Sequence, residues 1–73
     1  MKFIRNYKDN KIHSYYLPDV GDKVVDKDGN EGRCSGIFHC FPNVIYEISD
    51  GINSAGVKED VFSSGILSVV NTM

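Results

Sequence analysis

The side chains best suited to metal or nucleophilic chemistry are two histidines and two cysteines, His13, His39, Cys34 and Cys40. Their spacing matches no common zinc-binding pattern. His39 and Cys40 are neighbours, so on a strand they point to opposite faces and do not form a nucleophile–base pair. Cys34 and Cys40 lie about 20 Å apart if they share one strand, which is too far for a disulfide. We therefore expect two free thiols serving as small, half-buried apolar side chains, no metal site, no cofactor and no enzymatic activity.

Charge is divided unevenly along the sequence. The chain of 73 residues has a net charge of −2, yet residues 1–11 hold four basic side chains against one acidic one and are +3, which leaves −5 for the remainder. A basic segment rich in tyrosine suits nucleic acid, because cations neutralise phosphate while aromatic rings stack on bases. The alternative nucleic-acid site comprises Lys2, Arg5, Tyr7, Lys8, Lys11 and Tyr15. The acidic remainder argues against a nucleic-acid footprint over the whole surface, and it would equally neutralise a basic arm.

Two hairpins are predicted in the first half of the chain. Apolar and polar residues alternate over 2–7 and 12–17, with a polar turn at 8–11, and Pro18 ends this segment because it lacks an amide hydrogen. The stretch 20–37 contains strand-forming Val24 and Val25, followed by Asp28-Gly29, which favours a primed hairpin turn. The alternation then slips by one residue beside Gly36, which predicts a β-bulge.

The second half is also predicted to form short strands. Val44, Tyr46 and Ile48 alternate with polar residues and are expected to face the core. A strand over 55–58, a single helical turn over 59–62 and a last strand over 66–70 follow. The last strand is apolar on both sides and is expected to be central or covered. No window of helical length has a 3.6-residue period, so we expect an all-β protein with no long helix.

The arrangement of glycines, turns and apolar positions resembles the SH3-like barrel families of the KOW and Tudor type. The matching motifs are Gly21-Asp22-Lys23-Val24, Asp28-Gly29, Gly32-Arg33-Cys34, Ile37, Tyr46-Glu47-Ile48-Ser49-Asp50-Gly51 and Val57-Lys58-Glu59-Asp60-Val61. The resemblance covers about residues 19–70 and departs at Cys34, where these families usually carry Val. It implies a small five-stranded SH3-like barrel over 19–73, with residues 1–18 forming an N-terminal strand or hairpin arm packed on it.

The aromatic residues are too numerous for so small a core to bury completely, so some are expected to cover the barrel mouth or to line a surface groove. In the SH3-like families, loops with nearby aromatics often form the binding surface. The resemblance, together with the acidic turn at 26–31 and the aromatic arm, implies a partner-binding site comprising Tyr16, Phe38, Phe41, Asp28, Glu31 and Asn53.

These observations favour a non-catalytic binding module, most simply a protein-binding accessory or inhibitor protein of the kind that small phage or mobile-element genes encode. Nucleic-acid binding through the arm is one alternative, and small-ligand binding by an oligomer is another, because one small barrel encloses little volume. The oligomeric state, including a homodimer, is left open. Apolar runs are too short to cross a membrane, and no signal-peptide pattern begins the sequence, so a cytoplasmic location is expected.

Overall fold

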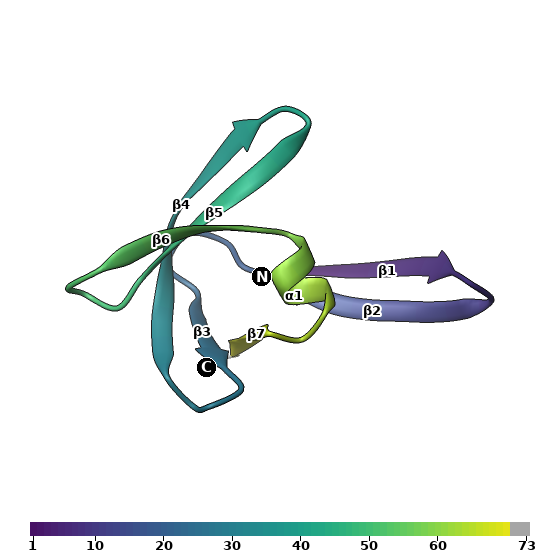
Figure 1. The fold of residues 1–73 in the computed structure, drawn as a ribbon, viewed down its shortest axis with the longest axis horizontal. Helices are drawn as coiled ribbons and strands as arrows, with labels where there is room; N and C mark the ends of the chain where they lie inside the picture. Colours follow the sequence, from purple (N-terminus) through teal and green to yellow (C-terminus); the bar gives the residue numbers. More distant parts are fainter. Residues whose placement is uncertain (71–73) are drawn as a thin grey trace.

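The computed structural model describes residues 1–70 and is built almost entirely of antiparallel strands. The elements, shown in Figure 1, are β1 (Lys2–Lys8), β2 (Lys11–Leu17), β3 (Lys23–Asp26), β4 (Glu31–Cys40), β5 (Asn43–Ser49), β6 (Ser54–Lys58), α1 (Asp60–Ser63) and β7 (Leu67–Val70). The predicted all-β class is therefore confirmed, and within residues 1–70 the one helix is the expected single turn. Residues 71–73 of the predicted 19–73 unit lie outside the described part of the chain.

Five of the strands form one sheet in the order β6-β5-β4-β3-β7. Strands β3 to β6 follow one another as a meander, and after α1 the chain returns so that β7 pairs with β3. Strand β7 is thus at one end of the order and is not central. The other alternative, a covered strand, agrees with the structure, because Leu67 and Val69 pack against the core and β2 lies beside the strand. No pairing between β6 and β7 closes the sheet within residues 1–70.

The turn between β3 and β4 differs from the predicted primed turn. Asp26 and Asn30 are joined by a backbone hydrogen bond of 3.0 Å, which leaves a three-residue loop, and Gly29 has a φ of +85°. This is the geometry of a type I turn followed by a left-handed residue. The Asp26 carboxylate selects it by accepting hydrogen bonds from the amides of Asp28 and Asn30, both at 2.9 Å. Hydrogen bonds from the side chain and the amide of Asn30 lower the pKa of Asp26.

The primed turn occurs in the arm instead. Asp9 and Asn10 have φ angles of 54° and 61° between the paired residues Lys8 and Lys11. Two positive φ angles in a two-residue loop define a type I′ turn, and Asp and Asn tolerate that conformation better than other residues with side chains. The predicted strands at 2–7 and 12–17 are confirmed by this hairpin.

The predicted bulge in β4 is also confirmed. The pairing of β4 with β5 shifts between Cys34 and Gly36, so Ser35 is an extra residue. Because the shift changes the alternation, both Cys34 and Ile37 belong to the core although they are three positions apart. The bulge therefore lets one long strand contribute to the core on both sides of its bend.

The buried core comprises Leu17, Val24, Cys34, Tyr46 and Phe62. The rings of Tyr46 and Phe62 meet edge to face, with centroids 5.4 Å apart, which is a favourable aromatic arrangement. The predicted core face of β5 is confirmed, since Val44 and Ile48 pack against this cluster beside Tyr46. The other cysteine corrects an expectation: Cys40 is exposed and not half-buried, because it lies at the far end of β4.

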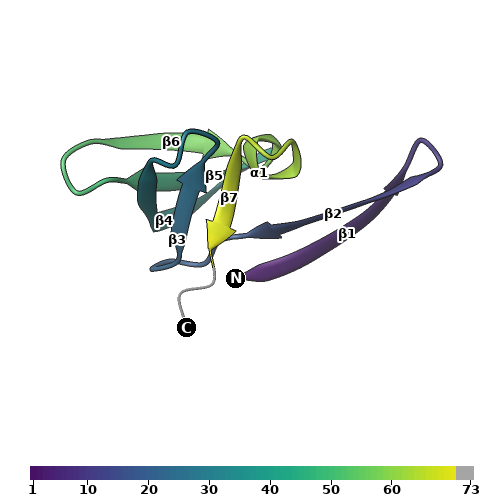
Figure 2. The same ribbon diagram turned by 90° about the horizontal axis from the view of Figure 1, so that it is seen from below.

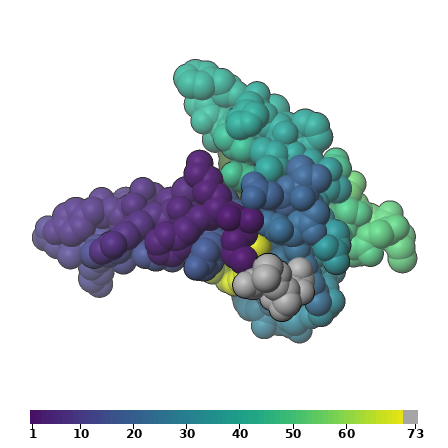
Figure 3. Space-filling model, turned by 180° about the vertical axis from the view of Figure 1, so that it is seen from behind, coloured from purple at the N-terminus to yellow at the C-terminus, as the bar shows by residue number. Residues whose placement is uncertain are grey.

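The β1–β2 hairpin, called the arm below, forms a separate two-stranded sheet that projects from the rest of the molecule (Figures 2 and 3). Its base is anchored in the core, because Leu17 and Pro18 are buried and Ile4 packs against the core cluster. The arm and the five-stranded sheet therefore share one core at this point. In the described part of the chain, no helix is long and apolar enough to span a membrane.

Candidate functional site

The arm has two faces with different roles. Directly opposed residues of an antiparallel pair lie on the same face, so the pairing of Phe3 with Tyr16, Arg5 with Ser14 and Tyr7 with Ile12 defines one of them. We call this surface the arm face; it consists of Phe3, Arg5, Tyr7, Ile12, Ser14 and Tyr16. The opposite face, the inner face, consists of Lys2, Ile4, Asn6, Lys8, Lys11, His13, Tyr15 and Leu17.

The arm face exposes apolar area that the fold leaves uncovered. Phe3, Tyr7, Ile12 and Tyr16 are 53%, 73%, 54% and 46% exposed. The rings of Phe3 and Tyr16 contact each other, with centroids 5.1 Å apart at an interplanar angle of 55°. Single exposed apolar residues are common, but this ribbon has two exposed apolar pairs on one side, Phe3 with Tyr16 and Tyr7 with Ile12, on either side of Arg5 and Ser14. Exposed apolar area gathered on one side of an element is typical of interaction surfaces.

The inner face holds the arm in place. The Tyr15 hydroxyl donates a hydrogen bond of 3.0 Å to Oε1 of Glu59, just before α1. Burial raises the pKa of Tyr15, and the hydrogen bond to the Glu59 carboxylate raises it further. Ile4 and Tyr15 also pack against the core. These contacts orient the ribbon so that the arm face points away from the five-stranded sheet.

The residues of the predicted nucleic-acid site do not form one surface. Arg5 and Tyr7 are on the arm face, whereas Lys2, Lys8, Lys11 and Tyr15 are on the inner face. Tyr15 is engaged by Glu59 and so is not free to stack on a base. A groove that follows a phosphate backbone needs several cations beside its stacking rings, and the arm face offers one.

The residues of the predicted partner-binding site are also spread over the molecule. Asp28 and Glu31 are at the turn before β4 and Phe38 is near its other end, so the two groups are separated by most of a ten-residue strand, about 25 Å. Phe41 follows β4 and is 98% exposed, while Tyr16 is on the arm and Asn53 is in the loop between β5 and β6. These six residues, predicted to form an aromatic groove with acidic loops, therefore do not lie together in one place.

Both predicted groups missed parts of the arm face. Phe3 and Ile12 belong to it and were not among the predicted site residues. The alternation within residues 2–7 already put Phe3 on the same side of its strand as Arg5, and the alternation within 12–17 put Ile12 on the same side as Tyr16. The sequence does not state which side of a two-stranded ribbon faces solvent. That information comes from the packing of Ile4 and Leu17.

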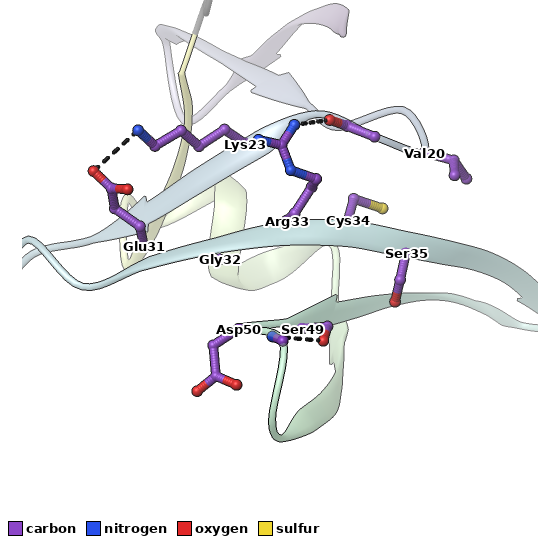
Figure 4. Close-up of a pocket in the computed structure, with 11 residues that line it drawn as sticks. Val20, Lys23, Glu31, Gly32, Arg33, Cys34, Ser35, Ser49 and Asp50 are labelled. Atoms are coloured by element: carbon purple, nitrogen blue, oxygen red, sulfur yellow. Dashed lines mark hydrogen bonds and ion pairs between the residues drawn. The ribbon is translucent and has the colours of Figure 1, made fainter.

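A cleft of about 530 Å³ lies across the outer side of β3, β4 and the loop after β5 (Figure 4). Its charged groups already have partners: Arg33 Nη1 donates to the Gly21 carbonyl at 2.6 Å, and Lys23 Nζ forms an ion pair of 3.0 Å with Glu31. Asp50 accepts hydrogen bonds from the amides of Ile52 and Asn53, which lower its pKa. The cleft is lined by residues from β3, from β4 and from the loop after β5, so local sequence patterns did not reveal it.

The candidate nucleophiles and metal ligands do not gather at either surface. Cys34 is buried, and burial raises the pKa of its thiol, so it is held in the protonated form that is a poor nucleophile. Cys40 is exposed at the end of β4. Within residues 1–70, no three His, Cys, Asp or Glu side chains cluster as metal ligands.

Comparison with known proteins gives no relative from which to transfer a function: no protein-family model, no curated protein and no solved structure matches this chain.

Proposed function

We propose that this chain is a non-catalytic protein-binding module, and that the arm face is its binding surface. The observation that carries the proposal is the exposure of Phe3, Tyr7, Ile12 and Tyr16 on one side of a ribbon whose other side is anchored to the core. Aromatic side chains dominate the energetics of protein interfaces, since they bury a large area at a low cost in rotamer entropy.

For the five-stranded sheet we propose an SH3-like barrel of the KOW or Tudor type. In its support, four strands form a meander, a helical turn follows, and the last strand returns to pair with the first strand of the meander. Such barrels serve many unrelated functions, so the functional proposal depends on the arm and not on the barrel. Two free thiols agree with the proposed cytoplasmic location, where disulfides are rare.

The test is an affinity capture from lysate with the tagged protein, at low and high salt, with and without nuclease. A protein retained at high salt after nuclease supports the proposal if Tyr16→Ala releases it. Phe41→Ala is the control, because it removes an exposed aromatic ring of similar size that is not on the arm face. Retention that nuclease abolishes would replace the proposal with nucleic-acid binding, and retention that Phe41→Ala abolishes instead would relocate the binding surface.

The open cleft supports a second candidate, small-ligand binding. A metabolite or nucleotide that raises the melting temperature of the wild type, and does so less for Arg33→Ala, would favour this alternative. If Arg33→Ala responds like the wild type, the cleft is not the ligand site.

A further inference from the structure

The outer edge of β1 is an unpaired strand edge. Among residues 1–70, strand β1 is hydrogen-bonded to β2 alone, in a sheet of two strands. In a two-residue hairpin the residues that flank the turn form a hydrogen-bonded pair, here Lys8 with Lys11, and such pairs alternate along the ribbon. The amide and carbonyl groups of Phe3, Arg5 and Tyr7 therefore point away from β2, toward the free edge.

This edge carries positive charge only. Lys2, Arg5 and Lys8 recur at every third residue of β1, and the strand contains no acidic residue. Within residues 1–70, none of these three side chains forms an ion pair or a side-chain hydrogen bond, although the rest of the molecule is acidic. The expected neutralisation of the arm by the acidic sheet is thus not observed for these side chains, and their charge remains available to a partner.

The same charges oppose self-association. If β1 paired with β1 of a second copy in antiparallel register about Arg5, Arg5 would face its own copy and Lys2 would face Lys8. Like charges directly opposite each other destabilise a strand pair. Cations on an edge strand commonly protect it against pairing with identical chains, and they leave an acidic strand as the favoured occupant.

Resting on the proposed function, we infer that the arm binds its protein partner by strand addition, with an extended acidic segment of the partner pairing along β1. Backbone hydrogen bonds to Phe3, Arg5 and Tyr7 extend the two-stranded ribbon to three strands, and the side chains of these residues line the arm face beside the added strand. Carboxylates of the partner lie against Lys2, Arg5 and Lys8. Charge complementarity gives the selectivity, and the exposed rings give apolar contact.

The probe is a synthetic seven-residue peptide with Glu at its first, fourth and seventh positions and Val or Thr elsewhere. Because the three cations are placed symmetrically about Arg5, this peptide matches β1 in either strand direction. One control peptide has Lys at the same three positions. A second control keeps the Glu residues but is N-methylated at alternate positions, which removes ladder hydrogen bonds without changing the charge.

Amide chemical shifts and amide hydrogen exchange of the full chain are followed by NMR during titration. We expect the Glu peptide to slow exchange at Phe3, Arg5 and Tyr7, with little change at Ile4 and Asn6, whose amides already face β2. The Lys peptide should bind at least about ten-fold more weakly, and the N-methylated peptide should not slow exchange. Arg5→Glu should narrow the preference for the Glu peptide, because Lys2 and Lys8 remain, and replacing all three cations by Glu should reverse it.

Equal binding of the Glu and Lys peptides, or changes confined to β6 or β7, would overturn the inference. Slowed exchange of the same amides by an oligonucleotide but not by the Glu peptide would overturn it in favour of nucleic acid. If the Glu peptide does not bind while Tyr16-dependent protein capture persists, the inference of strand addition is wrong but the proposed protein-binding function stands. If both fail, the proposed protein-binding function is wrong as well.

Discussion

Tyr15 and Tyr16 are adjacent in the sequence and are expected to respond to mutation in opposite ways. Tyr15 is on the inner face of the arm, where its hydroxyl donates to Glu59 at 3.0 Å. Tyr16 is on the arm face, 46% exposed, where its ring contacts Phe3. We predict that Tyr15→Phe lowers stability and leaves partner binding intact, whereas Tyr16→Ala weakens partner binding and changes stability little.

The magnitudes follow from the two environments. A hydrogen bond to a charged group contributes about 1.5–3 kcal/mol when buried, and partial exposure of this pair reduces it to about 1 kcal/mol. For a domain of this size, that change lowers the melting temperature by about 4–8 °C. Tyr16→Ala loses a cross-strand aromatic contact worth about 0.2–1 kcal/mol. If the arm face is the binding surface, we expect Tyr16→Ala to cost about 2 kcal/mol of binding free energy, the magnitude typical of a hot-spot residue, which is roughly 30-fold in affinity.

Urea unfolding followed by far-ultraviolet circular dichroism measures the stability of both variants, and titration of the captured partner measures binding. A double-mutant cycle with Glu59→Gln isolates the coupling between Tyr15 and Glu59. If Tyr16→Ala destabilises the protein more than Tyr15→Phe does, or if Tyr15→Phe alone weakens binding, the two faces have been assigned the wrong way round.

Other predictions test the core, the thiols and the β3–β4 turn. Phe62→Ala should cost about 3–5 kcal/mol of stability, whereas Phe41→Ala should change it by less than about 0.5 kcal/mol, as thermal unfolding will measure; similar losses would mean that Phe62 is not in the core. Ellman's reagent should label Cys40 rapidly and Cys34 only as fast as the protein opens, so a fast phase that survives Cys40→Ser would contradict the burial of Cys34. The lowered pKa of Asp26 means that its charged form stabilises the fold at higher pH, and this stabilisation is lost as the pH falls below about 4; Asp26→Asn should therefore show a smaller loss of stability on acidification, and an unchanged acid profile would exclude this role.

Local patterns were sufficient to predict most of the secondary structure. Alternation gave the arm strands, and the slip beside Gly36 gave the bulge in β4, because both depend on neighbouring residues alone. The predicted type of the β3–β4 turn was wrong because it considered only Asp28 and Gly29, whereas the Asp26 carboxylate, which lies before that pair, also binds the amide of Asn30, which follows it.

The candidate site was harder to predict because it depends on contacts between distant elements. Phe38 and Asp28 are ten positions apart, and only the extended course of β4 keeps them from sharing a groove. The engagement of Tyr15 likewise depends on Glu59, which is 44 residues away. The exposure of Tyr16 follows from the packing of Ile4 and Leu17 on the other side of the arm. Contacts between residues so far apart in the sequence cannot be predicted from the alternation of apolar and polar residues within one strand.

Site-specific photocrosslinking in cells distinguishes the arm face from the other exposed surfaces as the site of partner contact. A photoreactive amino acid is placed at Tyr7, on the arm face and 73% exposed, and in separate variants at Phe41 and in the cleft at Val20. If the partner binds the arm face, the variant at Tyr7 gives a discrete protein adduct and the variants at Phe41 and Val20 give none. An adduct from Phe41 or Val20 but not from Tyr7, or a nuclease-sensitive adduct from Tyr7, would contradict it.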